Sequence, residues 1–150
     1  MFNVVLVEPE IPPNTGNVGR LCLATGSVLH LVGPLGFDLD DKQLRRAGLD
    51  YWREVKLQRW TTLQELRASE PGEARFFYLT TKSPNPYYRV RFQTGDFLVF
   101  GRETKGLPEQ LLTENAANTL TIPMRGTRSL NLATAVAIVL FEAVRQQSSG

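Results

Sequence analysis

The sequence has 150 residues, of which 42% are hydrophobic and 21% are charged, and its net charge is +2. These values are ordinary for a single folded domain over residues 1–150, and they exclude a disordered or fibrous chain. The single cysteine, Cys22, excludes an intramolecular disulfide and a cysteine zinc site. The single histidine, His30, argues against multi-histidine metal sites and a Ser-His-Asp triad, so we expect no metal.

The first elements indicate a strand, a helix and a second strand. Phe2–Val7 is an apolar run typical of a strand buried on both faces. Because it lacks the basic start of a signal peptide, we expect a cytoplasmic protein. The prolines that follow end this strand, and Asn14 or Thr15 is expected to cap a helix that runs to Gly26. Val28–Val32 is the second strand. Cys22 lies between two leucines and is expected to be a small buried hydrophobe.

The middle of the chain continues the alternation of helices and strands. The expected elements are a helix at Asp40–Ala47, a strand at Val55–Trp60, a helix at Thr62–Ala68, strands at Arg75–Thr81 and Phe97–Phe100, and a frayed end at Gln146–Gly150. Such alternation favours an α/β fold with a mostly parallel sheet flanked by helices.

The last helix is expected to begin near Ser129, after a short strand at Thr119–Ile122 and a polar loop. Leu130–Val144 is apolar almost all the way round. The run is shorter than the roughly 20 residues that span a bilayer, so we expect no membrane contact. Instead, one side should face the core and the other a second copy of the chain. Val139 and Phe141 are expected to face outward.

Gly101–Pro108 forms a polar turn after a predicted strand. Its Gly-x4-Gly spacing imitates a P-loop, but Leu107 and Pro108 replace the Lys-Ser/Thr pair that would hold phosphate and magnesium, and no Gly-x-Gly-x-x-Gly follows any strand. The turn offers two glycines whose backbone a ligand can approach closely, with the Glu103 carboxylate between them. An ordinary glycine turn is the alternative.

Asn14, Asn17 and Arg20 recur at a spacing of three, with Gly16 and Gly19 between them. A glycine inside a helix costs about 1 kcal/mol relative to alanine. We therefore expect another chain or RNA to approach the open backbone closely. A capped helix with a surface arginine is the alternative.

The segment Arg128-Ser129-Leu130-Asn131 opens the last helix. Ser129 is expected to be the N-cap, which would be a sufficient structural role. A helix N-terminus also presents free N–H groups to a ligand. Asn131 lies on the narrow polar strip of an otherwise apolar helix, which favours a functional role.

Basic residues gather in several groups. These are Lys42, Arg45 and Arg46, then Arg53, Lys56 and Arg59, then Lys82, Arg89 and Arg91 beside Tyr87 and Tyr88. One such group is typical of a solvated surface, but several together favour binding to a phosphate backbone.

Taken in order, the three motifs resemble those of the SpoU branch of the SPOUT superfamily of RNA methyltransferases. The matching segments are 14–20, 101–108 and 122–132. Residues 8–17 and 45–51 are more similar still to the YibK/TrmL subfamily, the tRNA wobble-nucleotide 2′-O-methyltransferases. The resemblance covers nearly the whole chain.

The resemblance implies a single SPOUT domain with a C-terminal trefoil knot, a homodimer through the last helix, tRNA as the substrate and S-adenosyl-L-methionine as the cofactor. It implies a cofactor site lined by Leu79, Thr80, Gly101, Gly106, Ile122, Pro123, Met124, Ser129 and Leu130. It implies catalytic roles for Arg20, Glu103, Ser129 and Asn131, and RNA contacts from Asn17, Arg20, Arg45, Arg46 and Arg128. Ala133, Thr134 and Phe141 depart from the subfamily, where serine, asparagine and tyrosine are common.

The reaction implied is attack of the ribose 2′-hydroxyl of the wobble nucleotide, cytidine or uridine 34, on the methyl group of the cofactor. A guanidinium stays protonated in proteins, so we expect Arg20 to hold a phosphate and stabilise negative charge rather than to accept the proton. The alternatives are methylation of another RNA site, an RNA-binding module of the same fold without turnover, and a nucleotide-binding or dehydrogenase-like enzyme.

Overall fold

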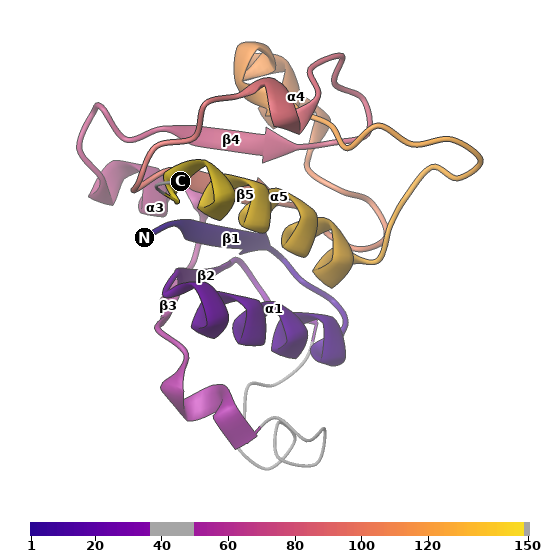
Figure 1. Ribbon diagram of the computed structural model, residues 1–150. Coiled ribbons are helices and arrows are strands. Elements are labelled where there is room, and N and C mark those ends of the chain that lie inside the picture. The colour runs from indigo at the N-terminus through magenta and orange to yellow at the C-terminus, as the bar shows by residue number, and fades with distance from the viewer. Residues whose placement is uncertain (37–49, 149–150) are drawn as a thin grey trace.

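The strand β1 (Asn3–Val7) lies in the middle of a parallel sheet in the computed structural model, which describes residues 1–36 and 50–148 (Figure 1). The other strands are β2 (Val28–Val32), β3 (Leu57–Trp60), β4 (Phe76–Leu79), β5 (Phe97–Phe100) and β6 (Thr119–Leu120). Their order within the described residues is β3-β2-β1-β5-β4-β6, and each neighbouring pair is parallel. The α/β fold with a parallel sheet is therefore confirmed.

Helices cover both faces of this sheet. They are α1 (Pro12–Thr25), α3 (Leu63–Ser69), α4 (Glu109–Glu114) and α5 (Leu132–Gln147), together with the short 3₁₀ helices η1 (Asp50–Glu54), η2 (Tyr87–Arg89) and η3 (Ala116–Asn118). The predicted helix at Asp40–Ala47, with Lys42, Arg45 and Arg46, lies outside the described residues. Among the helices that are described, none is long and apolar enough to cross a membrane.

Alternate residues of β1 face two separate cores. Val4 and Leu6 pack with residues of α1 and α5, which lie side by side over one face (Figure 1). Val5 and Val7 pack on the other face with Leu66 of α3. This two-sided burial explains why the strand reads as a continuous apolar run rather than as an alternating one. Cys22 is fully buried in the first core, as predicted.

Four strands are shorter than the sequence predicts, whereas β2 and β5 have the predicted bounds. The strand predicted from Val55 begins at Leu57, because Val55 closes η1 through a hydrogen bond from its N–H to the Trp52 carbonyl. The strand predicted to end at Ile122 ends at Leu120, and Thr121 forms only an isolated bridge.

The start of α1 corrects the predicted cap. The helix begins at Pro12 with Ile11 as the N-cap, so Asn14 and Thr15 lie inside its first turn. Proline suits this position because its missing N–H would have no partner there. Gly26 closes the helix at φ +67°, as predicted.

The start of α5 also differs from the prediction, because Asn131 is the N-cap rather than Ser129. The Asn131 side-chain oxygen accepts hydrogen bonds from the N–H groups of Ala133 at 2.9 Å and Thr134 at 3.3 Å. Serine and asparagine are both good caps, so the sequence alone did not distinguish the two positions.

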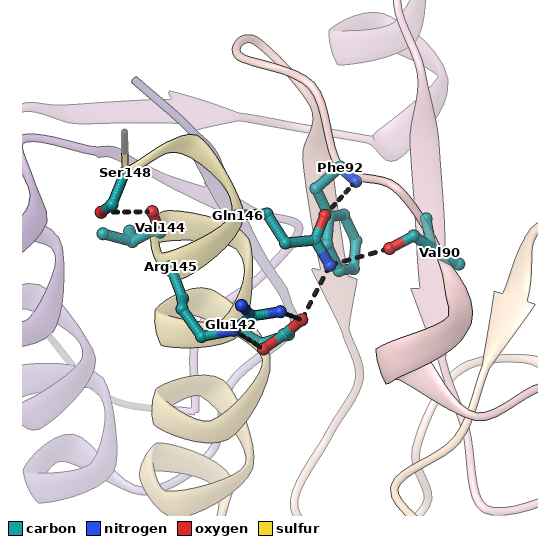
Figure 2. Close-up of polar contacts among 7 residues, drawn as sticks. All are labelled: Val90, Phe92, Glu142, Val144, Arg145, Gln146 and Ser148. Atoms are coloured by element: carbon teal, nitrogen blue, oxygen red, sulfur yellow. Dashed lines mark hydrogen bonds and ion pairs between the residues drawn. The ribbon is translucent and has the colours of Figure 1, made fainter. Parts of the chain in front are cut away.

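The end of α5 is ordered by side-chain contacts, so the predicted fraying at Gln146 is wrong. The Gln146 side chain accepts from the Phe92 N–H at 2.7 Å and donates to the Val90 carbonyl at 2.9 Å (Figure 2). On the exposed side, Arg145 pairs with Glu142 at 2.7 Å. These bonds extend the helix to Gln147.

The outward face of α5 is only partly as predicted. Phe141 is 45% exposed, which confirms its orientation. Val139 is fully buried in the core beneath the helix, so the prediction that it faces outward is wrong. The helix is apolar on several sides, and its periodicity alone therefore did not fix which side faces the sheet.

Candidate active site

The loops that follow β1 and β5 meet at the point where the order of the strands reverses along the sheet. The chain adds β2 and β3 on one side of β1, whereas β5, β4 and β6 lie on the other side. In open parallel sheets, ligands bind outside the carboxyl ends of the strands at such a point. The three sequence motifs follow β1, β5 and β6, so the topology gathers them at this edge.

A cavity of about 270 Å³ opens beside the β5 end of this edge. Eight of the nine residues predicted to bind the cofactor line it: Leu79, Thr80, Gly101, Gly106, Ile122, Met124, Ser129 and Leu130. Pro123 does not line it, although both of its chain neighbours do. The cavity is close in size to the smaller ligand sites of proteins, which start at roughly 300 Å³.

The turn after β5 can form only because residue 101 is glycine. A Cβ atom at Gly101 would lie 2.2 Å from the Gly106 carbonyl carbon and 2.3 Å from the Leu107 nitrogen. The turn is closed by paired hydrogen bonds between the backbones of Arg102 and Gly106. Gly106 adopts φ +67°, which also favours glycine. The two glycines therefore shape one wall of the cavity.

Glu103 joins this turn to the start of α1. Its carboxylate accepts hydrogen bonds from the N–H of Glu10 at 3.0 Å, the N–H of Ile11 at 2.9 Å and the side-chain amide of Asn14 at 3.3 Å. The negative charge thus lies against the N–H groups at a helix N-terminus, where it is stabilising. Side chains of the loop after β1 also bind the turn that carries Glu103.

Two more carboxylates, those of Glu8 and Glu10, bind the turn after β5 from the loop after β1. Together with Glu103 they form what we call the clamp between these two loops. Glu10 accepts from the N–H of Thr104 at 3.1 Å and from its hydroxyl at 2.8 Å. These bonds, the hydroxyl first, lower the pKa of Glu10 below its usual value. Glu8 pairs with Arg102 at 2.8 Å and adopts φ +50°, which is uncommon for a residue other than glycine.

Asn14 connects the clamp to the third motif. Its side-chain oxygen accepts a 2.9 Å hydrogen bond from the Asn131 side chain, while its amide donates to Glu103. Asn14 is buried, and its role was missed because asparagine near a helix start is usually a cap. The sequence feature that could have indicated this role is the position of Asn14 as the first residue of the first motif.

Arg20 and Asn17 lie on the exposed side of α1 and do not line the cavity. The Arg20 guanidinium carbon lies 5.7 Å from the centre of the Tyr51 ring. The Tyr51 hydroxyl donates a 2.8 Å hydrogen bond to the carbonyl of Gly16 on the same helix. Within one protomer, Arg20 therefore lies outside the cavity that Glu103 and Ser129 line, and Asn131 does not line this cavity either.

The open backbone at Gly19 serves the chain's own packing. A Cβ atom there would lie 2.6 Å from Trp52 Cζ3 and 3.3 Å from Val55 Cγ2. The expectation that another chain or RNA explains this glycine is wrong, because η1 occupies that surface.

Basic side chains border the cavity. Lys82, Lys105 and Arg128 line it, and Lys82 pairs with Glu109. The positive charge of these side chains favours a negatively charged ligand at the rim of the cavity.

Within the described residues, no group of three or more His, Cys, Asp or Glu side chains could hold a metal ion.

Comparison with known proteins gives a consistent picture. The model of the SpoU rRNA Methylase family matches residues 1–141. A tRNA (cytidine(34)-2′-O)-methyltransferase of Polaromonas sp. is 53% identical over 149 residues, covering 97% of this chain and 91% of the relative.

Two solved structures are similar along the whole chain. One, described as giving insights into the 2-OH methylation of C/U34 on tRNA, is 46% identical with a TM-score of 0.91 and covers 97% of this chain and 95% of its own. The other is the SpoU methyltransferase AviRb from Streptomyces viridochromogenes in complex with AdoMet, which is 26% identical with a TM-score of 0.82 and covers 99% of this chain and 61% of its own.

Proposed function

The chain belongs to the SpoU rRNA methylase family, and from this premise we propose that it transfers a methyl group from S-adenosyl-L-methionine to the ribose 2′-hydroxyl of nucleotide 34, cytidine or uridine, in tRNA. The observation that carries the proposal is that the second and third motifs line one cavity, while the first motif is joined to both of them through the hydrogen bonds of Asn14. The wobble position is supported by the relative from Polaromonas sp. and by the structure concerned with C/U34.

The cavity suits the proposed cofactor. Leu79, Ile122, Met124 and Leu130 present apolar surface, and the Gly101–Gly106 turn presents main-chain groups without side chains between them. Apolar walls with a few backbone donors and acceptors are typical of sites that hold a purine. When bound, the cofactor supplies a methyl group activated by a sulfonium. We propose that the nine predicted residues hold it, with Pro123 acting by fixing the backbone between its neighbours.

The proposed catalytic roles follow from the contacts. Glu103 and Asn131 position the cavity wall and the start of α5 through Asn14, and Ser129 lines the cavity and would orient the 2′-hydroxyl. Arg20 would hold a phosphate beside the reacting ribose and stabilise negative charge on the attacking oxygen. Asn17, Arg45, Arg46 and Arg128 would bind further along the RNA.

A homodimer through α5 would complete the active site. Phe141 leaves an apolar surface on the outer side of α5, and α1 lies beside this helix (Figure 1). A second copy that covers α5 would therefore also lie near Arg20, which this protomer's cavity does not include. We propose that the active site forms at this junction.

The single domain over residues 1–150 would contain a trefoil knot near its C-terminus. This proposal is supported by the path of the chain, since β6 lies at the edge of the sheet whereas α5, which follows it, lies beside α1 nearer the centre (Figure 1).

A tRNA substrate would place the protein in the cytoplasm.

The test uses cofactor with an isotopically labelled methyl group and unmodified tRNA, followed by nuclease digestion and mass spectrometry. The label should appear as a 2′-O-methyl group on nucleotide 34. Label on another nucleotide or on a base would overturn the proposed substrate position, and cofactor and RNA binding without transfer would favour an RNA-binding module.

A matched pair of variants tests Arg20. Arg20→Ala should lower single-turnover methyl transfer about 100-fold while leaving cofactor affinity unchanged. Arg67→Ala is the control, because its guanidinium also lies 5.7 Å from an aromatic ring, that of Phe76, but on the opposite face of the sheet. Equal rates in the two variants would remove Arg20 from the catalytic residues.

A further inference from the structure

Tyr51 contacts the first motif at two places on α1. Its hydroxyl donates to the Gly16 carbonyl at 2.8 Å, and its ring lies 5.7 Å from the guanidinium carbon of Arg20, one helical turn further on. Burial raises the pKa of Tyr51, so the hydroxyl keeps its proton and remains a donor. A cation within about 6 Å of an aromatic ring centre is attracted to the ring.

The segment that carries Tyr51 is firmly seated on the same helix. Trp52 and Val55 are buried against the backbone at Gly19, where even a methyl group would not fit. A long arginine side chain on a helix surface otherwise samples many rotamers, and ordering it costs free energy. The packing of η1 thus holds a rigid ring beside a flexible cation.

We propose that Tyr51 is a positioning residue for Arg20, restricting its guanidinium to the orientation that methyl transfer requires. This inference rests on the proposed role of Arg20. Before the substrate binds, the ring fixes the side chain, so the entropy of ordering Arg20 is lost on folding rather than during the reaction. The hydrogen bond from the Tyr51 hydroxyl to the Gly16 carbonyl supplements the packing of Trp52 and Val55, which seats the ring beside α1.

Three substitutions separate the ring from the hydroxyl and from the packing. Tyr51→Leu removes the ring and should lower single-turnover methyl transfer about tenfold, within the range expected for one cation–π contact. Tyr51→Phe keeps the ring and should stay within about threefold of the wild-type rate. Val55→Ala loosens the seating of the same segment without touching Arg20, and it should lower thermal stability while preserving the rate.

The affinity for S-adenosyl-L-methionine, measured by calorimetry, should be unchanged in all three variants. Equal rate losses in Tyr51→Leu and Tyr51→Phe would overturn the role of the ring. A comparable loss in Val55→Ala would show that only the packing of the segment matters, which also overturns the proposal.

A double-mutant cycle with Arg20→Ala distinguishes positioning from general stabilisation. If Tyr51 acts through Arg20, then Tyr51→Leu should have no further effect on the rate in the Arg20→Ala background. An unchanged tenfold effect in that background would contradict the proposal. If Arg20→Ala itself transfers methyl groups at the wild-type rate, the proposed role of Arg20 fails instead, and the two failures are distinguishable.

One readout needs no activity. Ring currents from Tyr51 should shift the proton resonances of the Arg20 side chain, assigned by their loss in Arg20→Lys. Tyr51→Leu should move these resonances and Val55→Ala should not. Unmoved resonances in Tyr51→Leu would mean that the ring does not hold the guanidinium in solution.

Discussion

The side-chain amide of Asn131 donates a 2.9 Å hydrogen bond to the side-chain oxygen of Asn14, 117 residues earlier in the chain. Asn14 in turn donates to Glu103. One buried asparagine therefore ties together α1, the turn after β5 and the cap of α5. Because the turn lines the cavity and α1 carries Arg20, this link holds the proposed cofactor site and the proposed catalytic helix in a fixed relation.

Asn14→Ala should destabilise the fold by about 1–3 kcal/mol, because it removes the hydrogen bonds of Asn14 with Glu103 and Asn131, each worth about 0.5–1.5 kcal/mol. Urea unfolding measures the loss. Asn17→Ala, one turn away on the exposed side of the same helix, is the control and should stay within about 0.5 kcal/mol of the wild type. Equal stabilities of the two variants would contradict the linking role of Asn14.

Gly101→Ala should abolish detectable binding of S-adenosyl-L-methionine in calorimetry, because its methyl group would collide with the backbone of Gly106 and open the turn. The control is Gly72→Ala, since a Cβ atom at Gly72 would meet nothing within 4 Å. Wild-type affinity in the Gly101→Ala protein would mean that the turn does not form the cofactor site.

The arrangement of this site was partly predictable from the sequence. The motifs at 14–20, 101–108 and 122–132 identified the segments that meet, because each follows a strand and parallel strands end at one edge. The contacts between them were not predictable, since the link from Asn14 to Asn131 depends on side-chain directions that spacing does not give. The same limit explains the error at Gly19, whose neighbour Trp52 is distant in sequence.

The fold shows a similar division. Binary pattern and β propensity predicted the strands to within a few residues, because burial on both faces leaves a strong signal. The caps and the orientation of α5 were harder. Ser129 and Asn131 have similar capping propensity, and Val139 and Phe141 are both apolar, so only the packed structure decides which residue caps and which faces the core.

His30 predicts an acid-sensitive stability. Its Nδ1 accepts from Trp60 at 3.0 Å, so Nε2 carries the proton and donates to Asn3 at 2.9 Å. Burial lowers the pKa of His30 from 6.5 to about 4. The unfolded chain therefore binds a proton at His30 below pH 6.5, whereas the folded chain binds this proton only near pH 4. The stability that neutral His30 contributes is thus lost as the pH falls through this window.

The size of this effect is about 3 kcal/mol between pH 7.5 and 4. The difference in free energy of unfolding between wild type and His30→Gln, measured by urea at several pH values, should change by this amount as the pH falls. A difference that is independent of pH would show that His30 titrates normally in the folded protein.

Phe141→Glu should convert the proposed dimer to a monomer and abolish methyl transfer, because it places a charge in the proposed apolar contact of α5. Phe141→Tyr keeps the ring and should remain dimeric and active. Sedimentation at micromolar concentration measures both. A stable wild-type monomer with full activity would contradict the proposed junction between subunits.

The proposed enzyme transfers its methyl group to the 2′-hydroxyl of nucleotide 34. The most direct measurement is the single-turnover rate of methyl transfer to a tRNA that carries one 2′-deoxynucleotide, placed either at position 34 or at position 32, with saturating enzyme and cofactor. The deoxy substitution at position 34 should abolish transfer, whereas the same substitution at position 32 should leave it near the rate for unsubstituted tRNA. Undiminished transfer to the tRNA with 2′-deoxynucleotide 34 would show that the methyl group goes elsewhere.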